Sequence, residues 1–477
     1  MTRASHPLSA GAVSPAVLQH AVLLCALLAP ILPAAAQPTA PAAGSPVQRV
    51  AVWRQAGVTS LSLGNGVDVH LRQMPKGNAG RVTLAALVPA VELDETAQTR
   101  GSAMLAIDAM KPAAGPARLR VTQRPEGLLI TGSCATSELE AALKQIAATL
   151  ADPVFDAKAF REAQERSIAL TRASEARADR RAADAMLRLM TADDPRLLHP
   201  TVAQLAAVEF DVATAGVRRS LATRAIDVAA VGDIDAPPVG PAAAAALGVL
   251  PARARERLAE QRSVKRLPLA PDAADAVATG TRPMLTVSLP APGIVELNES
   301  RVSSVAARLM ERQVAEALRG SGITVSATSG VAMTGRTYPA LGTVIGSFTL
   351  SGDEPLLRGA AGVARARIAR LVDEGPTQAQ TRRAADDASE EVSRRVETAD
   401  YWSQSLAMAW FLQVPVDELG TAPAAIAAVT PETLRQHMTR WWKPELIVTV
   451  TIVPGPGEAP APAELPAPHG APAAAPR

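Results

Sequence analysis

Histidine and cysteine side chains are sparse in this chain, which has 477 residues, six histidines and two cysteines. They are the residue types that most often bind zinc or attack a substrate, because imidazole and thiolate are good ligands near neutral pH. Two cysteines are too few for a disulfide framework or a zinc site made of thiolates. Cys134 stands at the end of an expected strand with no histidine near it in the sequence, so we expect a buried free thiol and not a nucleophile.

Three histidines fall in the expected body of the protein, and each has a structural explanation. His70 alternates with Val69 and Leu71 in a strand, so we expect it on the surface. His199 precedes a proline, which favours a role in a loop or cap, and His437 stands in the last expected helix with a structural role. The sequence contains no G-x-S-x-G elbow, no G-x-x-x-x-G-K-[ST] phosphate loop and no dinucleotide fingerprint, so it gives no support to serine hydrolysis or nucleotide chemistry.

Composition narrows the class of protein further. The 48 basic and 46 acidic side chains leave a net charge of +2, whereas a protein that binds duplex nucleic acid needs a concentrated basic face. Apolar residues make up 48% of the chain, which is enough for hydrophobic cores and excludes global disorder. At roughly 100–200 residues per domain, the length predicts two to three domains.

The N-terminus has the pattern of an export signal. An apolar run over residues 21–28 continues to Leu32, and the small residues Ala34 and Ala36 fit a signal-peptidase site after Ala36. Alternatives are a membrane anchor or, through Cys25, a lipoprotein. No other stretch approaches ~20 uninterrupted apolar residues, so we expect no transmembrane segment after cleavage and a periplasmic or secreted protein.

The body divides into two halves with the same order of elements. In the first half, strands are expected at 58–63 and 67–71 around the turn Gly64-Asn65-Gly66, and at 81–88, 118–121, 127–132 and 225–231. Helices are expected at 101–110, 137–150, 157–190 and 201–221. In the second half, strands are expected at 284–289, 324–327, 343–350 and 446–453, and helices at 301–318, 356–373, 378–396 and 430–441.

This order predicts an α+β fold with sheets and helices in separate layers. The predicted organisation is a signal peptide (1–36), a flexible lead-in (37–48), an N-terminal domain (49–235), a connector (236–282), a C-terminal domain (283–455) and a Pro/Ala-rich disordered tail (456–477).

Five short segments carry a resemblance to the insulinase-like (pitrilysin-like, M16) zinc peptidases, a family that includes the mitochondrial processing peptidases. Each of them stands where the family has a comparable motif: Leu63-Gly64-Asn65-Gly66-Val67, Gly101-Ser102-Ala103-Met104, Val231-Gly232-Asp233-Ile234, Leu318-Arg319-Gly320-Ser321-Gly322 and Trp441-Trp442-Lys443-Pro444-Glu445. The resemblance covers residues 58 to 454. It implies the insulinase-like metallohydrolase fold, with two homologous domains that each consist of a mainly antiparallel sheet packed with helices.

The zinc motif of that family is missing from this sequence. The family binds zinc through H-x-x-E-H on a helix, because two histidines four residues apart lie on one face and the glutamate can take a proton from zinc-bound water. Counted from Gly101, these positions are Met104, Ile107 and Asp108, which cannot form a catalytic zinc site. We therefore expect no catalytic residues and no bound zinc, although zinc is the family's cofactor. The glutamates of the region where the family has its more distant ligand are expected on a solvated helix face: Glu162, Glu165 and Glu175.

One residue retains a match to the family's substrate-binding motif. That motif pairs an arginine with a tyrosine, and Arg319 stands at the arginine position, while the tyrosine position falls near Val325. Arg319 is therefore a candidate substrate-binding residue, or a cation that interacts favourably with the end of a helix.

These observations favour a pseudo-protease that forms a heterodimer with a metal-bearing insulinase-like subunit in the periplasm, where it supplies a peptide-binding wall or stabilisation. Two alternatives stay open. The chain is an active zinc peptidase with atypical ligands, such as Asp108 with a distant glutamate or His199, or it is a peptide-binding or envelope scaffold protein without a partner.

Overall fold

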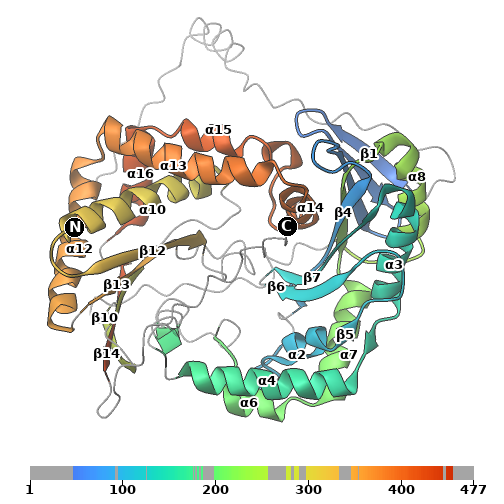
Figure 1. Cartoon of the computed structure of the whole chain (residues 1–477), viewed down its shortest axis with the longest axis horizontal. Helices are drawn as coiled ribbons and strands as arrows, with labels where there is room; N and C mark the ends of the chain where they lie inside the picture. Colours follow the sequence, from blue (N-terminus) through green and yellow to red (C-terminus); the bar gives the residue numbers. More distant parts are fainter. Residues whose placement is uncertain are drawn as a thin grey trace, which may run out of the picture. The chain divides into compact units, whose positions relative to one another are not determined.

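The computed structural model describes residues 47–91, 95–124, 126–175, 198–255, 275–280, 284–288, 297–331, 345–352, 354–443 and 447–454, with 177, 180, 181, 184, 185 and 188. The predicted export signal, its cleavage site and the predicted tail lie outside these residues. The described part is an α+β structure with two mixed sheets, each packed with helices (Figure 1). None of its helices is both long enough and apolar enough to cross a bilayer.

The first sheet has seven strands in the order β1-β2-β3-β9-β4-β7-β6. Only β3 and β9 run parallel, and every other neighbouring pair is antiparallel. The strands are β1 (Val47–Trp53), β2 (Val58–Leu63), β3 (Val67–Gln73), β4 (Arg81–Pro89), β6 (Arg120–Arg124), β7 (Gly127–Ala135) and β9 (Ile226–Gly232).

The predicted hairpin around Asn65-Gly66 is confirmed, since β2 and β3 pair from Val58 with Arg72 to Ser62 with Asp68. Gly66 has a φ of 82°, and a Cβ there would lie 2.2 Å from the carbonyl oxygen of Arg253. The turn therefore needs glycine both for its backbone conformation and for this close approach.

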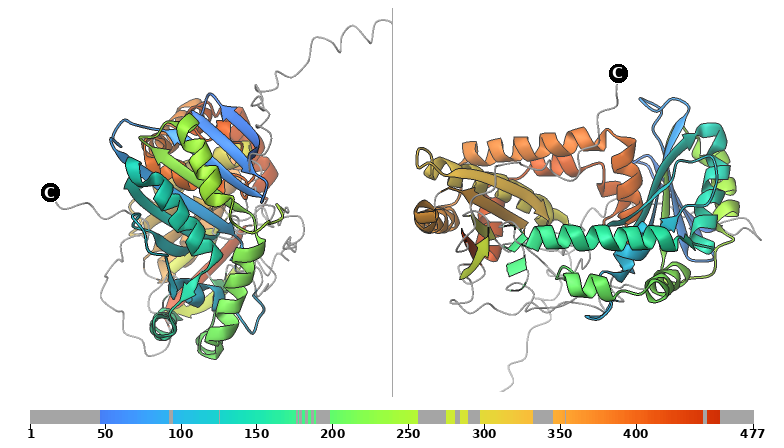
Figure 2. Two further views of the ribbon diagram at one scale, coloured as in Figure 1. Left: turned by 90° about the vertical axis from the view of Figure 1, so that its right-hand side faces the viewer. Right: turned by 60° about the horizontal axis from the view of Figure 1, so that its bottom comes forward.

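Both faces of the first sheet are buried, because side chains along each strand alternate between two hydrophobic clusters. In β4, Leu84 and Ala86 point into the cluster that includes α3 (Leu139–Ala151) and α8 (Ala236–Leu247). Leu87 points the other way, towards a cluster with α14 (Ala399–Met408), which packs on β9 and β4. Figure 2 shows α3 and α8 over the same face of the sheet.

Four helices gather at one end of this sheet: α2 (Ser102–Asp108), α4 (Ala157–Glu175), α6 (Val202–Ala207) and α7 (Phe210–Thr223). Beside them, β5 (Met110–Lys111) pairs with β8 (Val154–Phe155). The helical stretch predicted for 201–221 is observed as two helices, α6 and α7, and Gln164 Nε2 donates to the carbonyl oxygens of Leu205 and Val208, where α6 ends. The predicted helix 157–190 is observed as α4, and its continuation lies largely outside the described residues.

The segment predicted as a connector contains packed structure at both ends. Its first residues form α8, because Ala243, Ala244 and Leu247 are buried against the first sheet. Asn65 Nδ2 then donates to the carbonyl oxygens of Leu247 and Leu250. The last residues form β10 (Asp275–Gly280), a strand of the second sheet. The alanine-rich composition that we interpreted as a linker instead allows close packing, while the predicted domain boundaries stay predictions.

The second sheet has five strands in the order β10-β14-β11-β13-β12, in which only β10 and β14 run parallel. Its other strands are β11 (Met284–Ser288), β12 (Thr324–Val331), β13 (Ile345–Ser351) and β14 (Val448–Pro454). The helices α10 (Leu297–Ala317), α12 (Glu354–Glu374), α13 (Gln378–Val396) and α16 (Pro431–Trp441) share a core with it. The helices α10, α13 and α15 (Ala422–Ala427) lie side by side (Figure 1).

Candidate functional site

Helix α2 is the element on which the resemblance places the metal motif, and it is short and held on several sides. It packs against α7, β6 and α4, with Leu105 and Ile107 fully buried. Gly101 precedes it with a φ of 90°, and a Cβ at this position would lie 2.8 Å from Cδ2 of Leu205. Only glycine therefore fits the entry to this helix without strain.

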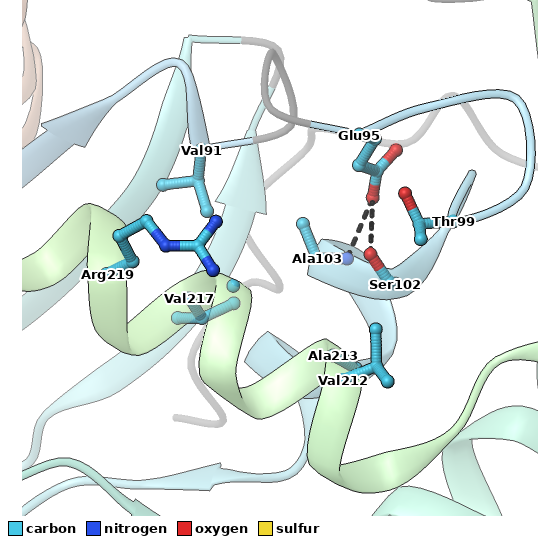
Figure 3. Close-up of a pocket in the computed structure, with 10 residues that line it drawn as sticks. Val91, Glu95, Thr99, Ser102, Ala103, Val212, Ala213, Val217 and Arg219 are labelled. Carbon is cyan, nitrogen blue, oxygen red and sulfur yellow. Dashed lines mark hydrogen bonds between the residues drawn. The ribbon is translucent and has the colours of Figure 1, made fainter.

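The first turn of α2 is capped by the carboxylate of Glu95. Its Oε1 accepts a hydrogen bond of 2.8 Å from the Ala103 N–H and lies 3.4 Å from Ser102 Oγ (Figure 3). Its Oε2 accepts from the Gly101 N–H at 3.1 Å and from Arg100 Nη1 at 3.0 Å. A carboxylate is favourable here because the first N–H groups of a helix have no partner within the helix and carry partial positive charge.

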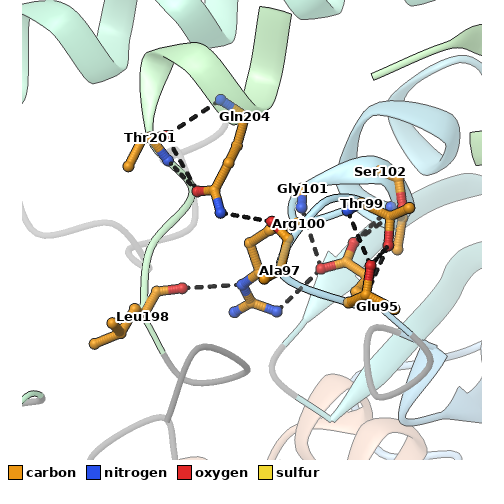
Figure 4. A network of polar contacts seen from close by, with 11 residues as sticks. Glu95, Ala97, Thr99, Arg100, Gly101, Ser102, Leu198, Thr201 and Gln204 are labelled. Atoms are coloured by element: carbon orange, nitrogen blue, oxygen red, sulfur yellow. Dashed lines mark hydrogen bonds and ion pairs between the residues drawn. The ribbon is translucent and has the colours of Figure 1, made fainter. Parts of the chain in front are cut away.

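This cap is linked to the segment that leads into α6 (Figure 4). Arg100 Nε donates to the carbonyl oxygen of Leu198 at 2.9 Å, and Gln204 Nε2 donates to that of Ala97 at 2.7 Å. The loop before α2 and the loop before α6 are therefore fastened together. We did not predict Glu95 as a site residue, and the only signal for it in the sequence is an acidic residue shortly before the start of a helix.

A small pocket of about 120 Å³ opens beside the cap (Figure 3). Glu95, Thr99 and Ser102 line one side, and Val217 and Arg219 of α7 line the other. The pocket thus has a carboxylate and a guanidinium on opposite walls. Ser102 and Thr99 carry the hydroxyl groups of the lining, and the Ser102 hydroxyl faces Glu95 without a histidine among the lining residues. This arrangement can bind a small polar group but has no catalytic acid–base pair of the Ser–His type.

The three positions that correspond to the family's metal motif hold side chains with other roles. Met104 is half-buried and packs against the core of the first half, and Ile107 belongs to that core with 0% of its surface exposed. Asp108 lies 3.7 Å from Arg166 of α4, and burial raises the pKa of its carboxyl above the usual value.

These residues do not fit a zinc ion. A buried butyl chain and a packed thioether supply no hard donor, and the remaining carboxylate already faces a cation. Among the described residues, no three His, Cys, Asp or Glu side chains are placed to hold a metal ion together. No catalytic step through zinc can therefore be derived from this part of the structure.

The predicted surface position of His70 is wrong, since only 6% of it is exposed. Its Nδ1 lies 2.8 Å from Ser60 Oγ, and its Nε2 lies 3.5 Å from Oδ1 of the buried Asp227. Arg255 donates to Asp227 at 2.9 Å and also lies 3.0 Å from Asp68. Burial and the neighbouring Asp227 raise the pKa of Asp68. The face of β3 that carries His70 is covered, which alternation alone does not reveal.

The other candidates lie apart from α2. His199 contacts Asp184 Oδ1 at 2.6 Å in an exposed loop, and His437 is buried between Glu299 and Ser303 of α10. The α4 glutamates are exposed, as predicted: Glu162, Glu165 and Glu175.

Arg319 is exposed in the turn after α10, and its function stays a prediction. Cys134 is buried and free, and burial raises the pKa of its thiol to about 11, as expected for an unreactive thiol.

Solved structures with the same architecture extend this description. The peptidase M16 inactive domain from Pseudomonas fluorescens matches with a TM-score of 0.67 and 15% identity, over 84% of this chain and 100% of that one. The periplasmic protease PqqL from Escherichia coli matches with a TM-score of 0.68 and 16% identity, over 93% of this chain and 51% of that one. A chain of Complex III2 from Candida albicans matches with a TM-score of 0.66 and 15% identity, over 83% of this chain and 96% of that one.

The present chain thus spans the whole inactive domain but about half the length of PqqL. No protein-family model matches the chain, and no curated protein matches it in sequence. At 15–16% identity, the structural matches define the architecture and leave activity open. The chain has the fold of the M16, pitrilysin-like peptidases.

Proposed function

We propose that this chain is a non-catalytic subunit that forms a heterodimer with a zinc-bearing M16-like chain and contributes a peptide-binding wall or stability to it. The observation that carries the proposal is the set of side chains on α2. Ile107 is part of the core, Met104 packs against it and Asp108 faces Arg166. A helix with these contacts supports the fold of the first half and leaves the metal chemistry to another chain.

Two comparisons support this proposal. The solved structure that the chain covers completely is described as an inactive domain, and the chain covers only half of the protease PqqL. A second chain of similar size would make up the remaining length. The common strand order of the two sheets supports the finer proposal that the chain contains two homologous domains. The pattern of the N-terminal sequence supports export to the periplasm.

Affinity purification of the tagged chain from its own source, followed by mass spectrometry, tests the proposal. We expect one other chain in equal amount, with an intact H-x-x-E-H motif, and peptide cleavage only when both chains are present. The zinc content of the purified chain alone should be far below one ion per chain. A lone monomer without such a chain, under conditions that preserve other complexes, would contradict the proposed subunit role and favour a scaffold protein.

A matched pair of variants separates the subunit from an active peptidase with atypical ligands. Asp108→Ala removes the only carboxylate among the three motif positions, while Asp152→Ala removes an exposed carboxylate at the end of α3. We expect the two variants to support the same cleavage rate in the reconstituted complex. Stoichiometric zinc in the isolated chain, lost together with cleavage in Asp108→Ala but not in Asp152→Ala, would establish the active peptidase instead.

A further inference from the structure

A second pocket, of about 190 Å³, lies away from α2 and is formed mainly by the helices of the second half. We refer to it as the α14 pocket, because Tyr401, Ser405 and Met408 on α14 form one wall. Residues Leu297 and Arg301 of α10, Arg395 of α13 and the segment after α14 complete it. Its volume is somewhat larger than the ~150 Å³ cavity that accommodates benzene in an engineered protein, so it fits a group of about that size.

The interior of the α14 pocket is apolar. Met408, Leu412 and Leu419 line it together with Leu297. Leu412 and Leu419 are buried, so this surface belongs to the packed core that α14 shares with the first sheet. An aliphatic side chain placed here would exchange water for apolar contacts, which is favourable in proportion to the area it buries.

Two arginines line the same pocket but differ in their pairing. Arg301 is 8% exposed, and its Nη1 and Nη2 donate at 2.9 Å to the carboxylate and the carbonyl oxygen of Glu418. Arg395 lies at the exposed rim, with its guanidinium 5.9 Å from the ring of Tyr401. Within the described part of the chain, Arg395 forms no ion pair and stands beside the apolar interior, whereas Arg301 is paired with Glu418.

The walls of the pocket are fixed before any ligand binds. Tyr401 Oη donates to the carbonyl oxygen of Leu419 at 3.0 Å, and its ring packs edge-on against Trp402. The Arg301–Glu418 pair links α10 to the segment after α14. A preformed pocket binds a ligand with less loss of conformational freedom than a loop that must first become ordered.

We propose that the α14 pocket binds the C-terminal residue of a peptide that ends in an aliphatic side chain. The side chain would occupy the apolar interior, and the terminal carboxylate would accept hydrogen bonds from Arg395. Glu126 is buried and also lines the pocket, so the ligand carboxylate would lie at the exposed rim beside Arg395 and not in the interior. This inference depends on neither a catalytic partner nor α2, so it can fail or hold independently of the proposed subunit role.

Isothermal titration calorimetry on the isolated full chain tests this site with three probes: acetyl-leucine, acetyl-leucinamide and the peptide acetyl-Ala-Ala-Ala-Leu with a free carboxylate. We expect the peptide to bind at least as tightly as acetyl-leucine. Both acids should bind about tenfold or more tightly than the amide, because the amide lacks the charge-assisted hydrogen bonds. Equal binding of acid and amide, or no binding of either acid, would overturn the proposal. A peptide that binds tenfold more weakly than acetyl-leucine would assign the pocket to a small free acid instead.

Two neighbouring arginines provide the matched variants. Arg395→Gln should bring the affinity for both acids down to that of the amide, while Arg394→Gln should leave every affinity unchanged, because Arg394 does not line the pocket and its Nη1 lies 4.0 Å from Glu390. If Arg395→Gln still bound the acids more tightly than the amide, the assignment of the carboxylate to Arg395 would be contradicted.

A variant that ends at residue 455 tests the chain's own C-terminus as the occupant. Binding of the acids only to this shortened chain would replace the proposed peptide by the tail.

Discussion

The two sheets share one strand arrangement but anchor their first helices in different ways. In the order β3-β9-β4-β7-β6 and in the order β10-β14-β11-β13-β12, the first pair is parallel and the others are antiparallel. The equivalent strands also follow one another along the chain in the same sequence. The helix after the second of these strands is α2 in the first half and α10 in the second, with 7 and 21 residues respectively.

A glutamate lies at the start of each of these helices, but its partners come from different distances along the chain. Glu95 binds the backbone N–H groups of residues six to eight positions later. Glu299, in the first turn of α10, instead accepts from Trp441 Nε1 at 3.3 Å and lies 2.8 Å from His437 Nδ1, both on α16. The same topology therefore permits a local cap in one half and a long-range polar contact in the other.

This difference matters for the site, because the short helix depends on its surroundings for stability. A helix of seven residues is far below the length at which isolated helices form in water, so α2 exists only through its cap and its packing. Its core-facing positions are then needed for structure and are not free to carry metal ligands.

A charged side chain placed in the core of the first half should cause the largest decrease in the free energy of unfolding. We expect Ile107→Glu to lower the free energy of unfolding by roughly 3–5 kcal/mol, the range for an unpaired buried charge. Met104→Glu, three residues earlier on the same helix, should cost much less because Met104 is only half-buried. Urea unfolding followed by circular dichroism measures the free energy of unfolding of both variants. Equal decreases in the two variants would show that the Met104 and Ile107 sides of α2 contribute equally to the core.

Removal of each glutamate anchor tests the comparison between the halves directly. Glu95→Gln should cost roughly 1.5–3 kcal/mol, because it weakens hydrogen bonds to a charged group. Hydrogen exchange should accelerate at the amides of Gly101 and Ala103. Glu299→Gln should leave those amides protected and accelerate exchange around His437 instead. Acceleration at α2 in both variants would mean that the halves do not have separate anchors.

Loss of the contact between the first sheet and α14 should lower the free energy of unfolding by a smaller amount. The Arg72 guanidinium lies 3.8 Å from the centre of the Trp402 ring, and its Nε donates to the carbonyl oxygen of Ala56. We expect Arg72→Met to cost about 1 kcal/mol through loss of the cation–π interaction. Arg49→Met, at an exposed position of β1, should change the unfolding free energy by less than about 0.5 kcal/mol. Similar urea midpoints for the two variants would argue against a contribution from Arg72.

The smallest expected effect is the contribution of Asp156 to the stability of the fold at acidic pH. Hydrogen bonds from Lys111 and from the Lys158 and Ala159 N–H groups lower the pKa of Asp156 from 3.8 to about 2. Its contribution to stability is therefore present above pH 3.8 and is lost as the pH falls to about 2. Asp156→Asn should make the urea midpoint less dependent on pH in this range, while Asp152→Asn should not. An unchanged pH profile in Asp156→Asn would remove Asp156 as the source of this dependence.

Much of the secondary structure was predictable because its signals are local. The helix predicted at 378–396 is observed over the same residues, with Thr377 as a capping residue whose hydroxyl accepts from the Gln380 N–H. The hairpin at Asn65-Gly66 and the burial of Cys134 are also confirmed. In contrast, the prediction for 118–121 is shifted relative to β6, because the register of a strand depends on its neighbour β7.

The candidate site was predictable only in part. Counting from Gly101 in the sequence shows that the metal ligands are missing, but it does not show what the side chains at positions 104, 107 and 108 contact. Glu95 as a cap, Arg166 as the partner of Asp108 and the α14 pocket each join residues whose sequence separation gives no regular pattern. Composition was misleading for α8, because the same alanines suit a linker and a closely packed helix.

The sequence by itself determined where many of the strands and helices form and that residues 104, 107 and 108 lack the histidines and glutamate of an M16 zinc site, because periodicity and residue type are local properties. The tertiary structure alone decided that His70 is buried next to Asp227, that α2 is capped by Glu95 and that Arg395 lies beside an apolar pocket. These features arise because sheet pairing and helix packing bring distant side chains together, and their burial and charge depend on those neighbours.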